Sequence, residues 1–107
     1  MIERQIKMGY VTQFKLKVLP MDNSLLKEGI LDITIKDLIF GIECKWYDYN
    51  DDMLLLSKQH PNNLFILDGY GEDNWDIWRA FYKNGKTYKW RLKEVIILPE
   101  FDESLMK

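Results

Sequence analysis

Apolar and polar side chains alternate most regularly near the start of the chain, over residues 9–19 (GYVTQFKLKVL). One side of this segment carries Tyr10, Thr12, Phe14, Leu16 and Val18, and the other carries Val11, Gln13, Lys15 and Lys17. A period of two predicts a β-strand with one buried face. Pro20 ends the strand, because proline cannot donate a hydrogen bond to a neighbouring strand.

Residues 22–42 carry a mixed pattern. Asn23 or Ser24 can cap a helix, with Asp22 near its positive end. That helix would carry the apolar residues Leu25, Leu26, Ile30, Ile33 and Leu38. Gly29 is unfavourable inside a helix, and Leu31, Ile33 and Ile35 alternate as in a strand. We expect a helix that begins near Ser24, with the strand as the alternative.

A second helix is predicted over residues 48–60. Asp48 or Asn50 can cap it, the carboxylates of Asp51 and Asp52 suit its N-terminal dipole, and Pro61 stops it. A strand over residues 63–68 follows, and the Gly-Tyr-Gly sequence at 69–71 predicts a turn.

The strongest local signal is Asn84-Gly85, which predicts a two-residue β-hairpin turn between strands over residues 76–83 and 86–93. Residues 95–98 extend the last strand or form another, and Pro99 ends it. The order of these elements predicts an α+β fold, in which one or two helices pack on one face of a mainly antiparallel sheet that ends in a C-terminal β-hairpin. No repeat or linker divides residues 1–107, so we expect a single compact domain.

The two-residue turn sets the register of the hairpin, so opposite residues have numbers that add up to 169. One face carries Ile77, Arg79, Phe81 and Lys83 beside Lys86, Tyr88, Trp90 and Leu92. This face has the larger aliphatic content, and we expect it to meet the core. The opposite face would then expose two aromatic rings among three cations, and the predicted partner-binding residues are Trp78, Tyr82, Lys89, Arg91 and Lys93.

The alternative is that this face has no binding role and is a solvated strand surface, on which Arg91 packs against Trp78 as a cation–π pair. If the hairpin lies the other way round, the binding surface is instead to be sought on the first face, around Arg79, Lys83, Lys86, Tyr88 and Trp90.

Charge is segregated along the chain although it nearly cancels overall: 15 Lys and Arg oppose 17 Asp and Glu, for a net charge of -2. Residues 77–93 hold six bases and no acid. The turn before them holds a secondary acidic surface, Asp68, Glu72, Asp73 and Asp76. Such carboxylates can meet a basic partner, but a polar turn is the simpler interpretation.

Candidate catalytic chemistry is sparse. Cys44 is a single cysteine without a disulfide partner, which favours a reducing, cytoplasmic compartment. Cys44 and His60 lack the neighbours that a metal site or a nucleophile needs, and no phosphate-binding glycine loop is present. No apolar run has the length of a membrane span, and the start of the chain lacks a signal-peptide core. We expect no enzyme activity, no catalytic residues, no cofactor, no metal and no membrane partner.

The second half of the chain resembles a family of small, uncharacterised proteins carried by bacteriophages and mobile elements. The similarity covers about residues 43–104 and the opening of the first strand. It is carried by CKWYD at 44–48, LFILDGYGE at 64–72, DIWRAFYKNGK at 76–86 and PEFDES at 99–104. The resemblance implies a compact, non-enzymatic protein that binds and inhibits a host protein or complex in the host cytoplasm. An inhibitor of host defence, similar in role to an anti-CRISPR protein, is the expected form.

Two alternatives remain open at this point. The hairpin could serve a nucleic-acid-binding accessory module, because aromatic rings between cations can stack bases and neutralise phosphates. An enzyme with an unrecognised site is the other. In each case a homodimer could form through the apolar strand edge at residues 95–98.

Overall fold

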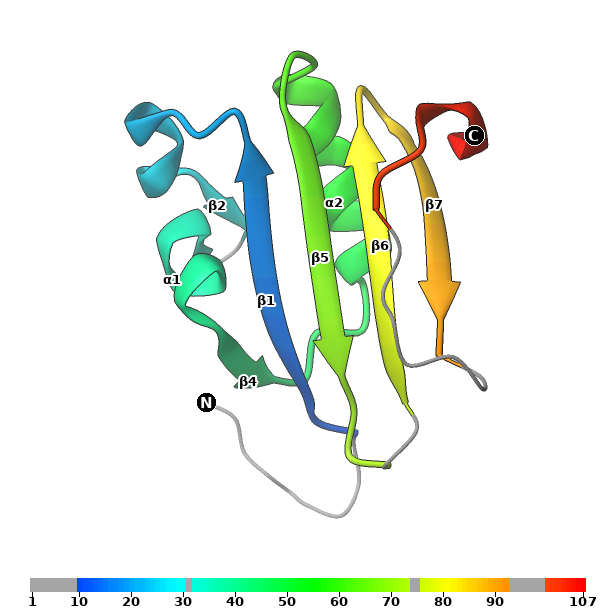
Figure 1. Ribbon diagram of the computed structural model, residues 1–107. Coiled ribbons are helices and arrows are strands. Elements are labelled where there is room, and N and C mark those ends of the chain that lie inside the picture. The colour runs from blue at the N-terminus through cyan, green and yellow to red at the C-terminus, as the bar shows by residue number, and fades with distance from the viewer. Residues whose placement is uncertain (1–9, 31, 74–75, 93–99) are drawn as a thin grey trace.

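The computed structural model describes residues 10–30, 32–73, 76–92 and 100–107, and its centre is a five-stranded antiparallel sheet with the order β4-β1-β5-β6-β7 (Figure 1). The strands are β1 (Thr12–Leu19), β4 (Ile42–Cys44), β5 (Leu64–Tyr70), β6 (Ile77–Lys83) and β7 (Lys86–Arg91). A separate two-stranded sheet joins β2 (Gly29–Ile30) and β3 (Ile33–Thr34). The predicted α+β fold with a mainly antiparallel sheet is confirmed.

Two α-helices pack on one face of this sheet. They are α1 (Ile35–Phe40), beside β1, and α2 (Tyr49–Gln59), which crosses β5, β6 and β7. Beneath them lies the main core, whose sheet residues are Phe14, Leu16, Val18, Phe65, Leu67, Trp78, Ala80 and Tyr82. The alternation predicted for β1 is confirmed, because Phe14, Leu16 and Val18 are all buried there. No helix in the described ranges is long and apolar enough to cross a membrane.

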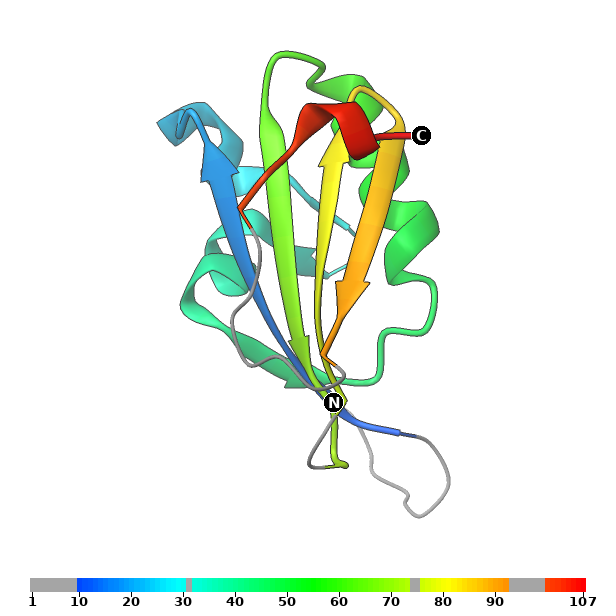
Figure 2. The ribbon, with the colours of Figure 1, turned by 45° about the vertical axis from the view of Figure 1, so that its right-hand side comes forward.

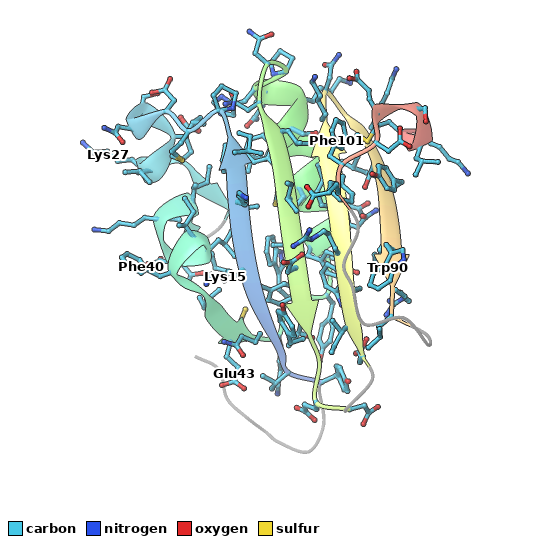
Figure 3. All side chains as sticks on the ribbon, viewed as in Figure 1. Lys15, Lys27, Phe40, Glu43, Trp90 and Phe101 are labelled. Atoms are coloured by element: carbon cyan, nitrogen blue, oxygen red, sulfur yellow. The ribbon has the colours of Figure 1, made fainter. Side chains whose placement is uncertain are left out.

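A second core lies on the opposite face of the sheet. The C-terminal segment, residues 100–107 with the 3-10 helix η2 (Glu103–Leu105), runs over this face, as Figures 1 and 2 show from two directions. Tyr88, Phe101 and Met106 pack against the buried residues Leu64, Ile66 and Phe81. The stacked rings of Phe81 and Tyr88 have centroids 4.7 Å apart. Phe101 lies over the upper end of β6 (Figure 3). Both faces of the β6–β7 hairpin are therefore at least partly covered.

The helix expected from Ser24 onward is wrong beyond its first turn. A 3-10 helix, η1 (Asn23–Lys27), forms there, and Asp22 rather than Asn23 or Ser24 caps it by accepting a hydrogen bond of 3.0 Å from the Ser24 N–H. Gly29 then enters β2, where a side chain would overlap the backbone of Ile33. The helix proper begins later, behind a capping box of Thr34 and Asp37 that satisfies two orphan N–H groups.

The predicted hairpin is confirmed in turn and register. Asn84 and Gly85 have φ values of 50° and 76°, as a type I′ turn requires, and Lys83 lies opposite Lys86. The Gly85 N–H donates to the Ser57 hydroxyl at 2.9 Å, and this hydroxyl donates to the Leu54 carbonyl at 2.8 Å. The hydrogen bonds fix the hairpin turn to α2.

Other predictions had mixed outcomes. The second helix is confirmed with Asp48 at its N-cap, although the Asp48 side chain makes no capping hydrogen bond. The turn expected at 69–71 is wrong, because β5 continues through Tyr70 and reverses only after Gly71, whose N–H bonds the Asp76 carbonyl. Lys93 and the strand expected over 95–98, with its dimer edge, lie outside the described residues.

Candidate functional site

The two aromatic rings expected on an exposed hairpin face are in the main core instead. Trp78 is 3% exposed and Tyr82 is fully buried, because α2 crosses the hairpin on their side. The Tyr82 hydroxyl donates to Asn50 Oδ1 at 2.9 Å, and burial raises the pKa of this tyrosine well above its ordinary range. The predicted orientation of the hairpin is wrong, and the stacking platform on which the nucleic-acid alternative depended is not accessible.

Two cations of the same face, Lys89 and Arg91, are exposed as predicted. Lys89 lies with its ammonium 4.7 Å from the Tyr49 ring centroid and 4.8 Å from the Trp78 ring, and it also bonds the Tyr49 hydroxyl. The cation–π contact with Trp78 therefore belongs to Lys89 rather than to Arg91. Arg91 instead pairs with Asp76 at 3.0 Å, and its side chain stays 53% exposed.

Arg91 borders a small hollow between the start of β1, the segment before α2 and the hairpin. Its volume is about 180 Å³, and we call it the aromatic pocket. Its walls include Tyr10, Tyr47, Tyr49, Asp76, Trp78 and Arg91. A hollow of this size, lined by rings and one ion pair, can take a single apolar or aromatic side chain.

The floor of the aromatic pocket is held rigidly. Tyr49 stacks on Trp78 with ring centroids 4.7 Å apart, and Trp46 packs edge-on against Phe14 at 5.1 Å. The Trp46 Nε1–H donates to Asp52 Oδ2 at 2.8 Å, so the residues before α2 are anchored to its first turn. Ring pairs of this kind add stability beyond the area that they bury.

The rim of the aromatic pocket is more open. Tyr47 is 64% exposed, and its hydroxyl accepts a 2.8 Å hydrogen bond from the Tyr10 N–H. The Tyr10 hydroxyl in turn accepts from the Asp73 N–H at 3.0 Å. These bonds connect three segments that are distant in sequence and fix the exposed Tyr47 at the hollow that Arg91 also lines.

The carboxylates of the predicted acidic surface have partners of their own. Asp68 forms a two-pronged ion pair with Arg79, at 2.7 and 3.0 Å, and this hydrogen bonding raises the pKa of the guanidinium. Asp76 holds Arg91, and Glu72 Oε2 accepts from the Val11 N–H at 2.9 Å. These three carboxylates therefore stabilise the fold around them.

The structure brings together some of the predicted binding residues and adds others. Trp78 and Arg91 line the aromatic pocket, and Lys89 lies over the Tyr49 and Trp78 rings without being part of the lining. Tyr82 lies in the main core, away from the pocket. The sequence reading missed Tyr10, Tyr47 and Tyr49. The density of rings in residues 46–49, directly before a helix, is the one signal that could have pointed to them.

Comparisons of the chain with protein-family models, with curated proteins and with solved structures find no match.

Proposed function

We propose that this protein binds a host protein and inhibits it, with the aromatic pocket at the centre of the binding surface. The observation that carries the proposal is the pairing of an exposed ring, Tyr47, with a half-exposed guanidinium, Arg91, at the rim of a hollow of about 180 Å³. Tyrosine, tryptophan and arginine around a small pocket are the residues on which protein interfaces most depend.

The size and charge of the aromatic pocket favour a protein partner. Pockets for small ligands usually have volumes of roughly 300–1,000 Å³, and this hollow is smaller. Asp76 within its wall and the net charge of -2 disfavour a phosphate backbone, since phosphate neutralisation supplies most of the affinity for nucleic acid. A partner's apolar side chain fits the size of the hollow, and a single carboxylate of the partner can pair with the exposed Lys89, outside the wall that holds Asp76.

The biological setting belongs to the same proposal. The resemblance of residues 43–104 to small proteins of phages and mobile elements supports a host protein as the partner and the host cytoplasm as the place of binding. Inhibition of host defence follows from that setting.

The test is affinity capture from bacterial lysate with identification by mass spectrometry. We expect one stoichiometric partner, and we expect Tyr47→Ala or Arg91→Ala to weaken its binding about tenfold or more. Tyr70→Ala is the matched control, because Tyr70 is also exposed (40%) but projects from the other face of the sheet into a different hollow.

Two results would contradict the proposal. Absence of any stoichiometric protein partner contradicts the binding function. Equal losses in Tyr47→Ala and Tyr70→Ala contradict the role of the aromatic pocket. A salt titration with single-stranded DNA and RNA runs alongside, and tight binding at low salt that Arg91→Ala abolishes would favour nucleic acid.

A further inference from the structure

The outer edge of β7 presents backbone hydrogen-bonding groups in a defined pattern. In an antiparallel pair the N–H and C=O of every second residue point toward the partner strand. The Leu92 N–H bonds the Ile77 carbonyl at 2.8 Å, so Trp90, Tyr88 and Lys86 also turn their backbone groups toward β6. Thr87, Lys89 and Arg91 therefore turn theirs outward, and β7 is the last strand in the sheet order.

The chain itself uses one of these outward positions. The Thr87 N–H donates to the Lys107 carbonyl at 3.0 Å, and the Lys107 N–H donates to the Thr87 carbonyl at 3.3 Å. This reciprocal pair has the form of an antiparallel bridge, so the β7 edge is open to an extended backbone. The next two outward positions, Lys89 and Arg91, make no backbone hydrogen bond to any other residue that the structure describes.

The positive charge along this edge favours an acidic segment over a second copy of the same strand. Lys86, Lys89 and Arg91 are all exposed, and the Lys89 ammonium lies over the rings of the main core rather than across the edge. A second copy of β7 would set like charges against each other, which disfavours pairing between copies. Carboxylates on an incoming strand would instead meet cations on both faces: Lys89 and Arg91 on one face, where Arg91 also pairs with Asp76, and Lys86 on the other.

We infer that the β7 edge binds an extended, acidic segment of the partner protein as an added strand, an inference that rests on the proposed function. The main chain of the segment bonds the backbones of Lys89 and Arg91. Its carboxylates lie beside the exposed side chains of these residues, where Arg91 also holds Asp76. Arg91 also lines the aromatic pocket, so a neighbouring apolar residue of the same segment can enter it. Backbone bonds supply affinity in this mode, and side-chain pockets supply specificity.

A peptide titration followed by NMR tests the inference without the partner. The probe is a peptide of alternating glutamate and valine, and its control has lysine in place of glutamate. We expect the acidic peptide to shift the amide signals of Lys89 and Arg91 and to slow their hydrogen exchange. The inference is overturned by equal binding of the basic peptide, by shifts confined to other strands, or by no shift at millimolar concentration.

Proline substitution tests the same bond with the captured partner. The Lys89 N–H points away from β6, so Lys89→Pro removes the outward donor without removing a bond inside the sheet. Lys89→Ala removes the same charge and keeps the donor, so it is the matched control. We expect Lys89→Pro to bind about fivefold more weakly than Lys89→Ala.

Thermal melts establish that the proline variant folds, and Arg91→Pro against Arg91→Ala repeats the comparison if it does not. Equal affinity of the proline and alanine variants overturns the inference and leaves the proposed function standing. Absence of any protein partner, by contrast, contradicts the proposed function itself.

Discussion

Trp78 lies directly opposite Gly69 in the pairing of β5 with β6, and its indole covers the glycine. The ring also contacts Phe14, Tyr49 and Lys89, so this side chain of β6 joins β1, β5 and β7 to the start of α2. A residue with this environment belongs to the core, whatever the charges beside it in sequence.

We therefore expect Trp78→Ala to lower the free energy of unfolding by about 3 kcal/mol or more, as for other buried large aromatics. Trp90→Ala should cost clearly less, because Trp90 is only partly buried. Urea denaturation of both variants measures the difference. A larger loss at Trp90 would contradict the orientation of the hairpin.

The contact between Trp78 and Gly69 gives a second prediction. A methyl group added at Gly69 would overlap the indole, so Gly69→Ala should cost roughly 1–3 kcal/mol through overpacking. Trp78→Leu frees that space, so the two substitutions together should cost less than the sum of their separate effects. A double-mutant cycle by urea denaturation tests this, and simple additivity would contradict the contact.

The buried Tyr82 makes the free energy of unfolding depend on pH in the alkaline range. Burial raises its pKa above the ordinary 10.0, so the hydroxyl stays neutral in the folded protein while it ionises in the unfolded chain. The unfolded state then binds fewer protons, and the free energy of unfolding falls as pH rises above about 10. Urea denaturation between pH 8 and 11 should show a steeper fall for the wild type than for Tyr82→Phe. Parallel curves would contradict this.

At the scale of elements, α2 and the hairpin turn are joined through the buried Ser57. Ser57→Ala removes the hydrogen bond from the Gly85 N–H, and a hydrogen bond of this kind contributes about 0.5–1.5 kcal/mol. The exposed Ser104 is the control, and Ser104→Ala should change stability by less than about 0.5 kcal/mol. Equal small losses in thermal melts of the two variants would contradict the role of Ser57.

The elements that sequence reasoning recovered are those with local signals. The alternation in β1, the acidic first turn of α2 and Asn84-Gly85 each act within a few residues. The helix predicted from Ser24 is misplaced, because the capping box of Thr34 and Asp37 starts the α-helix about ten residues later, at Ile35. The short strands before it depend on pairing rather than on propensity.

The orientation of the hairpin and the aromatic pocket could not be predicted in the same way. Both hairpin faces carry rings and cations, so the local sequence does not indicate which face is buried. Burial depends on distant segments: α2 packs on one face, and residues 100–107 pack on the other. The pocket joins Tyr10, Tyr47 and Arg91, which meet only when β1, the residues before α2 and β7 are assembled. Local sequence patterns do not predict contacts between segments that lie so far apart in the chain.

At the scale of the whole molecule, the C-terminal segment acts as the second layer of cover. Phe101 packs on Phe81 and Tyr88, and the Tyr88 hydroxyl accepts a 2.8 Å hydrogen bond from the Asp102 N–H. Phe101→Ala should cost about 2 kcal/mol, less than at a fully buried site, because Phe101 is only partly buried. The variant should also release Phe81 to solvent, which increased binding of a hydrophobic dye would report. Unchanged stability and dye binding would contradict this cover.

The strand order has a consequence for how the protein is made. The turns of the β5–β6–β7 meander join neighbours in sequence, but Leu19 pairs with Leu64 and Gln13 with Tyr70, across the whole helical half of the chain. Contacts of such sequence separation form slowly, because a long loop must close first. On the ribosome β1 emerges before β5 and can gain its main partner only after β5 has left the exit tunnel. Until then β4 is the only described strand that can pair with β1, and an apolar strand that lacks its main partner is prone to aggregation.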